Sequence, residues 1–289
     1  MATTIAGAFN TFKSNLQITD LQQDTVSTRQ QNVRSAVEGE LTILSSFLTG
    51  SYSRKTMIAP LSEADIDIFI VLHSQYFEQN GQASLLDRVK RVLKKTYPNT
   101  PEISRNGQAV TISFTDFKVD VVPAFNRNGG GYLIPSTYGG GSWISTDPKK
   151  HVEISTQKNT AHNGDLIPVV KMIKRWNRMI DWYFSSFHLE ALAWNIFEGV
   201  TISDFSSGVR YFFDKGRSYI GSPVYDPSGY GGNVGRYLDT QTKIDEAVSR
   251  FSTAFTRAKN AEAYASQGKI SDAITEWRKI FGDKFPVYG

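Results

Sequence analysis

The feature that most constrains the fold is a β-branched apolar run, residues 66–72, that begins beside two aspartates spaced two apart, Asp65 and Asp67. In a strand, residues i and i+2 point to the same face. Asp65 and Asp67 therefore project side by side, while Ile66 and Ile68 turn into a core. The pattern predicts a strand that carries two carboxylates on one face.

A Gly50-Ser51 pair precedes this strand, and a third acid, Asp120, lies in another strand-like run at 117–123. Magnesium prefers oxygen ligands and often binds through a few carboxylates together with substrate phosphates. Gly50 would let the backbone approach a phosphate closely, and Ser51 would donate its N–H and hydroxyl. The set predicts a site for a nucleoside triphosphate with two Mg²⁺ ions, Mn²⁺ being the alternative. The competing interpretation is that strand-end acids are ordinary solvated residues and Gly-Ser a simple turn.

The composition narrows the class of protein. The 289 residues include 32 Lys and Arg against 28 Asp and Glu, a net charge of +4, which suits phosphate-rich ligands but is too small to indicate a duplex nucleic-acid partner. There is no cysteine, which excludes disulfides, a thiol nucleophile and a Cys-ligated zinc module. Neither a signal peptide nor a membrane-spanning run is recognisable, so we expect a soluble, cytoplasmic protein without a membrane partner.

Hydrophobic periodicity predicts an α+β first half and a helical second half. In the first half we expect helices at 3–15 and 20–48, a basic amphipathic helix at 84–97, and a hairpin of strands at 109–114 and 117–123. The Gly-, Ser- and Pro-rich stretch 126–150 predicts an extended loop. Further helices are expected at 165–182, 186–198, 203–219, 240–267 and 270–281.

Gly-Ser, Asp-x-Asp and a third strand acid together resemble the polymerase-β-like nucleotidyltransferase superfamily. The runs 169–177 and 184–190, and Asp226-Pro227 with Asn233-Val234, are similar to the helical lobe of cGAS/DncV-like nucleotidyltransferases (CD-NTases). The N-terminal helices, 143–148 and 277–286 resemble the bacterial branch that makes cyclic oligonucleotide signals in CBASS anti-phage defence. The resemblance implies a two-lobed α+β fold: a core at 1–160 with a small mixed sheet, and a helical lobe at 161–289 that closes the active-site cleft.

The resemblance also implies roles for single residues. Asp65 and Asp67 would hold both metal ions, and Asp120 would bind the second ion and take a proton from the acceptor hydroxyl. The implied nucleotide-binding residues besides Gly50 and Ser51 are Lys171, Lys174, Ser186, Phe187, Asp226 and Asn159. Each has a structural alternative: a solvated basic face for the lysines, a helix cap for Ser186, a core position for Phe187, and turn formation for Asp226 and Asn159. The four histidines show no metal spacing, and we assign them no chemistry.

The implied function is condensation of ribonucleoside triphosphates into a cyclic di- or trinucleotide second messenger with release of pyrophosphate. Two alternatives stay open: a linear oligonucleotide synthetase or RNA-tailing transferase, and a catalytically silent nucleotide-binding protein. In related bacterial enzymes a small C-terminal residue can be joined to a target by a ubiquitin-transfer-like partner. Gly289 stands at that position, and a plain chain end is the alternative.

Overall fold

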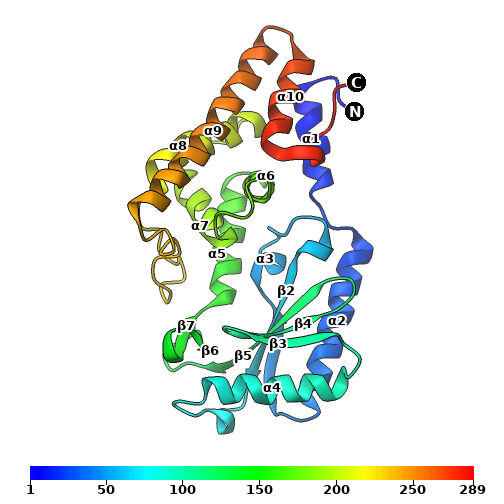
Figure 1. The fold of residues 1–289 in the computed structure, drawn as a ribbon, viewed down its shortest axis with the longest axis vertical. Coiled ribbons are helices and arrows are strands. Elements are labelled where there is room, and N and C mark those ends of the chain that lie inside the picture. Colours follow the sequence, from blue (N-terminus) through cyan, green and yellow to red (C-terminus); the bar gives the residue numbers. More distant parts are fainter. The chain divides into compact units, whose positions relative to one another are not determined.

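A computed structural model describes residues 1–289. By its internal contacts the chain divides into two compact units, one formed by residues 18–153 and the other by residues 1–17 together with 154–289 (Figure 1). Each unit has its own apolar core, and each is described by itself.

The first unit is built on a mixed sheet. Strand β2 (Asp65–Leu72) lies antiparallel to β1 (Ile43–Leu48) and parallel to β5 (Lys118–Asn126). Strands β4 (Ala109–Ser113) and β3 (Glu102–Asn106) continue the sheet beyond β5, which gives the order β1-β2-β5-β4-β3. The parallel pairing of β2 with β5 sets the acids of the two strands against each other in register.

Helices α2 (Asp20–Glu38) and α4 (Gln82–Thr96) pack against one face of this sheet (Figure 1). Their apolar stripes meet the alternate residues of β2, so that Ile66 and Ile68 are fully buried in the same core as Val33 of α2 and Leu86 of α4. The residues between them, including Asp65 and Asp67, lie on the opposite face. The expected strand, its orientation and the helix at 84–97 are thereby confirmed.

The helix expected at 20–48 ends ten residues early. Helix α2 stops at Glu38, and residues 43–48 form the edge strand β1 instead. Leu44 and Leu48, which suggested a longer helix, fit both the helical period of 3.6 and the strand period of 2. Residues four apart share a face in a helix, and residues an even number apart share a face in a strand. Pairing with β2 decides between the two periods, since it satisfies the backbone groups of β1.

The stretch 126–150 is not an extended loop as predicted. Strands β6 (Tyr132–Ser136) and β7 (Ser142–Thr146) form a hairpin that extends the sheet from the end of β5, and helix α5 (Pro148–Ala161) follows. Three glycines at 129–131 and three at 139–141 have positive φ, which places them in the turns before and between the strands. The glycines therefore mark the turns, and the sequence analysis did not predict the two five-residue strands next to them.

The second unit is helical. It contains α6 (Leu166–Met179), α7 (Ser186–Ile196), α8 (Phe205–Tyr219), α9 (Gln241–Ser266) and α10 (Ile270–Phe281), all close to their expected bounds. Trp176, Phe184, Phe213 and Phe251 form an aromatic core between α6, α8 and α9, with ring centroids 4.9–6.4 Å apart. None of the helices combines the length and apolar character that crossing a bilayer requires.

Helix α1 (Ile5–Asn15) packs in this helical unit, although the sequence placed it with the sheet. Helix α1 packs there because its aromatic side chains contact those of the C-terminal segment. The ring centroids of Phe9 and Trp277 are 4.9 Å apart in an edge-on arrangement, and those of Phe12 and Phe281 are 4.6 Å apart. The chain ends also pair, because Ala2 N–H donates to Val287 O at 3.0 Å (Figure 1). A division of the chain at residue 160 thus differs from the compact units in α1 and in the end of α5.

Substitution Phe12→Ala tests this packing. Phe12 is fully buried, so its truncation is expected to cost about 3–5 kcal/mol and to lower the thermal unfolding midpoint, with faster amide exchange in α1. Leu21→Ala is the matched control, because Leu21 is 77 % exposed and its loss should leave the midpoint unchanged. Equal midpoints for the two variants would contradict the proposed role of α1.

Candidate active site

Three carboxylates lie on the face of the sheet opposite the helices. Asp65 and Asp67 are alternate residues of β2, and in the parallel ladder Asp67 pairs with Asp120 of β5. Asp65 is exposed, whereas Asp67 and Asp120 are half-buried. The predicted arrangement on two strands is therefore present, with the acids at neighbouring positions of the ladder.

Asp120 is held by a neighbour on the next strand. Its Oδ1 accepts a hydrogen bond from the Thr111 hydroxyl at 2.5 Å, and Thr111 is its register partner on β4. Burial raises the pKa of Asp120; the Thr111 bond lowers it and the charge of Asp65 raises it further, with a net upward shift. Asp120 is thus a stronger base than an ordinary aspartate.

Gly50 touches the second aspartate directly. It has φ +64°, and a Cβ at this position would overlap the carboxylate of Asp67. The backbone is tied to the same strand, because Thr49 N–H donates to Asp67 O at 2.9 Å. Gly50 begins the short helix α3 (Gly50–Ser53), and no other residue type allows both this φ and this close approach.

The turn around Ser51 is stabilised by hydrogen bonds within the same loop. Ser51 O accepts hydrogen bonds from the backbone N–H of Thr56 at 2.9 Å and of Met57 at 3.1 Å, and Thr56 is fully buried. Thr56 therefore supports the loop. Arg54, three residues after Ser51, is only 9 % exposed. Gly50 and Ser51 thus stand on a fixed turn beside Asp67.

The donor set suits a hard divalent cation in its chemistry. All three side chains are carboxylates, and the charge of Asp65 raises the pKa of Asp120, a repulsion that a cation would relieve. No group of three or more acidic or histidine side chains is spaced to hold an ion as the side chains stand, and one oxygen of Asp120 is engaged by Thr111. The metal-binding role of Asp65, Asp67 and Asp120 stays a prediction.

In the helical unit, Lys171 and Lys174 are buried on α6 and not on a solvated face. Lys174, 4 % exposed, forms an ion pair with Glu190 of α7 at 3.2 Å, and Glu190 is fully buried. Lys171, 6 % exposed, donates to the neutral Gln17 amide at 2.6 Å. Burial and the Lys174 charge lower the pKa of Lys171 to about 8. Helix α6 thus carries two buried ammonium groups, of which Lys174 pairs with a carboxylate and Lys171 with a neutral amide, and this favours binding of an anion.

Ser186 and Phe187 begin α7. Ser186 is its first residue and Ser185 occupies the cap position, so the capping role considered for Ser186 is wrong. Phe187 is half-buried, and its ring meets Trp194 edge-on at 6.1 Å. Ser186 lies four residues before Glu190, on the same face of α7 as the partner of Lys174.

Asp226 and Asn159 have structural roles in this unit. Asp226 Oδ1 accepts from Ser228 N–H at 2.8 Å, which is the turn-forming role that the sequence left open. Asn159 lies on helix α5 and not in a turn; its Oδ1 accepts from Ile167 N–H at 2.9 Å and so satisfies the first turn of α6. Base contacts by either residue stay predictions.

His188 is fully buried near the start of α7. Its Nδ1 lies 2.9 Å from the Tyr237 hydroxyl, which also accepts from Ser185 N–H at 3.0 Å. Burial lowers the pKa of His188 to about 4 and raises that of Tyr237 to about 12. Both groups are therefore neutral at pH 7 and hold the start of α7 against the segment around 237.

Three partners of predicted residues were missed: Thr111, Glu190 and Gln17. Thr111 had a signal, since it is the one polar residue within the apolar run 109–112. Glu190 also had one, because it interrupts an apolar helix stretch, His188 to Trp194. Gln17 had none, since its contact with Lys171 joins residues 154 apart in the chain.

Comparison with known proteins decides the family. Residues 3–159 match the profile of the Second Messenger Oligonucleotide or Dinucleotide Synthetase domain. The chain belongs to this family. It is 30 % identical over 275 residues to a probable cyclic nucleotide synthase of Bacillus cereus, with 83 % of this chain and 81 % of the relative covered. It is 27 % identical over 258 residues to a cyclic AMP-AMP-AMP synthase of Acinetobacter, with 83 % and 72 % covered.

A solved structure of Escherichia coli CdnC with ATP has the same fold. It superposes with a TM-score of 0.76 at 20 % identity and covers 97 % of this chain and 98 % of the other. The predicted α+β, two-lobed nucleotidyltransferase fold is confirmed by this likeness. The predicted class of activity, synthesis of a cyclic oligonucleotide second messenger by nucleotidyl transfer, is confirmed by the family and its relatives.

Substitution Gly50→Ala is expected to abolish most activity, because the new methyl group must displace the Asp67 carboxylate. Gly268→Ala is the matched control: Gly268 has φ +75°, but its Cβ would meet nothing within 4 Å, so it carries the backbone strain without the clash. Product formation and the thermal midpoint are measured for both. Similar losses of activity in the two variants would refute a specific role for the Gly50–Asp67 contact.

The lowered pKa of Lys171 predicts a pH-dependent stability. The ordinary lysine pKa of 10.5 applies to the unfolded chain and about 8 to the folded one, so between these values the unfolded chain binds more protons. Stability from this group is therefore lowest below pH 8 and rises toward pH 10.5, by on the order of 3 kcal/mol. Lys171→Met should remove this rise. The measurement is the difference in thermal midpoint between wild type and variant from pH 7 to pH 10; a constant difference would contradict it.

Proposed function

We propose that the chain condenses two or three ribonucleoside triphosphates into a cyclic di- or trinucleotide, releases pyrophosphate, and acts in CBASS anti-phage signalling. The single observation that supports this best is the in-register pair Asp67 and Asp120, with Gly50 against one acid and Thr111 on the other. Such crowding of acids costs stability. In a family that synthesises oligonucleotides, binding of metal ions and triphosphate by these acids would explain why the fold tolerates this loss of stability.

We assign the first step to these side chains. The acceptor hydroxyl of one nucleotide attacks the α-phosphate of another, a P–O bond forms, and pyrophosphate leaves. Asp120, whose pKa is raised by burial, accepts the hydroxyl proton. Bound Mg²⁺ or Mn²⁺ on Asp65, Asp67 and Asp120 would neutralise triphosphate charge and lower the pKa of the hydroxyl. A second turn of the same chemistry closes the ring.

Each unit, taken by itself, offers donors for phosphate groups. Gly50 and Ser51 offer backbone N–H groups and a hydroxyl on a braced turn. Lys171 and Lys174 offer buried ammonium groups, with Ser186 on the α7 face that carries Glu190. Because the Lys171 ammonium is disfavoured by its surroundings, a phosphate beside it would raise its pKa again and gain binding energy.

Conjugation of Gly289 to a target stays a separate prediction. The residue is exposed, and its N–H donates to Ala2 O at 3.3 Å. A partner that takes Gly289 would have to release this pairing. The observation supports access to the residue and does not identify a partner.

The double substitution Asp65→Ala/Asp67→Ala tests the proposed site. We expect product formation from the four ribonucleoside triphosphates to fall by roughly a thousand-fold or more, since charge stabilisation by a bound ion contributes several kcal/mol. Mass spectrometry identifies the product, and resistance to phosphatase distinguishes a ring from a linear chain.

Asp116→Asn is the control for this experiment. Asp116 pairs with Arg29 at 2.9 Å in the same unit and belongs to neither acidic strand position. It should keep full activity. Full activity in the double variant would reject the site, and a phosphatase-sensitive product would favour the linear synthetase.

A further inference from the structure

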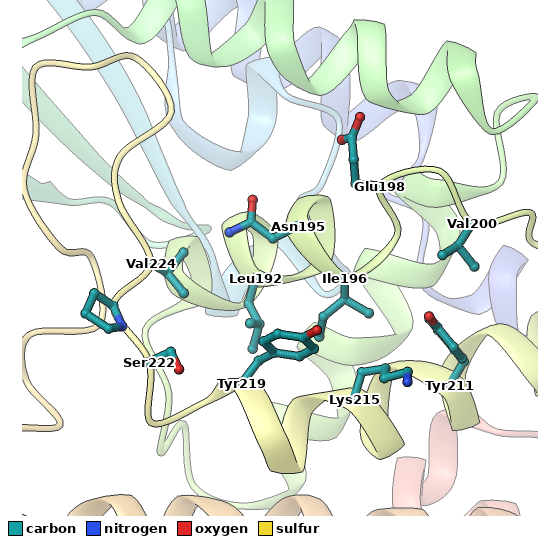
Figure 2. A pocket seen from close by; sticks show the side chains of 11 residues that line it. Leu192, Asn195, Ile196, Glu198, Val200, Tyr211, Lys215, Tyr219, Ser222 and Val224 are labelled. Carbon is teal, nitrogen blue, oxygen red and sulfur yellow. The ribbon is translucent and has the colours of Figure 1, made fainter.

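A cavity lies in the helical unit. It has a volume of about 300 Å³ and is enclosed by the C-terminal half of α7, by α8 and by residues 222–224 (Figure 2). Volumes of this size are at the lower end of those that hold small molecules. The cavity is large enough for one mononucleotide and too small for a cyclic oligonucleotide.

The cavity is separate from the residues assigned to the triphosphate. Leu192, which lines it, is two residues beyond Glu190, or about 200° around α7 at 3.6 residues per turn. Asn195 and Ile196 share the face of Leu192. Glu190 and Ser186 lie on the other face of the helix, so a molecule in the cavity would not meet Lys174 or its partner.

One wall of the cavity is aromatic and basic. Tyr211, Lys215 and Tyr219 are spaced four apart on α8 and point into the cavity from the same side (Figure 2). The Lys215 ammonium lies 5.6 Å from the Tyr211 ring centroid and forms no ion pair. Tyr219 is 51 % exposed, a large aromatic surface at the mouth. Such a wall suits a planar ring that carries an anionic group.

The opposite wall is apolar with a polar rim. Leu192, Ile196 and Val224 are buried and form the floor, and the Asn195 side chain stands at the edge (Figure 2). A primary amide can donate to and accept from one base edge at once, as with N6 and N7 of adenine. Glu198 is also at the rim, but its carboxylate is paired with Lys158. The uncompensated charge of the cavity is therefore that of Lys215.

We propose that this cavity binds a nucleoside monophosphate, with the base between the tyrosines and the apolar floor, its edge on Asn195, and the phosphate on Lys215. The site is distinct from the one proposed for catalysis and does not depend on it. A bound nucleotide would contact Val224, whose N–H donates to Asn233 Oδ1 at 3.0 Å and whose C=O accepts from Val234 N–H at 2.8 Å. It would thus stabilise the base of the loop that carries Asp226.

Binding of AMP to the full chain is measured by calorimetry without metal or triphosphate. Removing the ammonium in Lys215→Ala or the ring in Tyr219→Ala should each raise the Kd at least ten-fold, and Lys215→Arg should restore binding. Adenosine and ribose 5-phosphate, which lack the phosphate or the base, should each bind at least ten-fold more weakly than AMP. Lys259→Ala is the matched control, since Lys259 also lies beside a ring, Phe255, at 5.8 Å but outside the cavity.

The site is located by photolabelling with 2-azido-AMP and mass spectrometry of the peptides. Label is expected within residues 211–224 of the wild type and absent there in Lys215→Ala, while the thermal midpoints of the two proteins agree. Amide exchange in residues 224–235 should slow with AMP in the wild type only. Absence of binding at millimolar AMP, label only elsewhere, or equal Kd values for wild type and Lys215→Ala would each overturn the proposal.

Discussion

The parallel pairing of β2 with β5 is the constraint on which the candidate site depends. It sets Asp67 directly beside Asp120, and like charges at paired positions of a ladder oppose folding. The fold keeps them together because the alternate residues of both strands, such as Ile66 and Val119, are fully buried under α2 and α4. A slip of one residue would turn those apolar side chains out, so the hydrophobic core fixes the position of the acids.

The helical unit also buries charged side chains at a cost in stability. Lys174 and Glu190 are almost fully removed from water, and such a pair contributes little net stability because both charges lose their hydration. Loss of either partner alone would leave an uncompensated charge, at a cost of roughly 3–5 kcal/mol. Substitution of Lys174 is therefore expected to affect folding, which substitution of a solvated lysine would not do. Lys171, beside it, has only a neutral amide as partner.

Secondary structure was predicted best where the apolar residues follow a single period, either that of a strand or that of a helix. Alternation over 65–72 identified β2 and the face of its acids, and the long apolar stripes of α6 to α10 gave their bounds. Prediction failed where helical and strand periods coincide, as in β1, and where strands of five residues are too short to show a pattern, as in β6 and β7. Asn159 shows a further limit: its Oδ1 accepts from a backbone N–H eight residues on, in the next helix, and only the turn between α5 and α6 brings the two groups together. The burial of Lys171 is likewise set by packing that no local pattern contains.

Helix α7 links the two nucleotide sites that we infer in the helical unit. One face carries Ser186 and Glu190, and the other carries Leu192 and Asn195. Its start is held by the neutral pair His188 and Tyr237, and a Cβ at Gly235 would press on the His188 ring. Helix and loop are thus packed without free space on that side, whereas the cavity side has room. A ligand that fills the cavity adds contacts to Val224 at the opposite end of the same loop. The loop is then held from both ends, which reduces the conformational entropy that a base contact by Asp226 would otherwise cost.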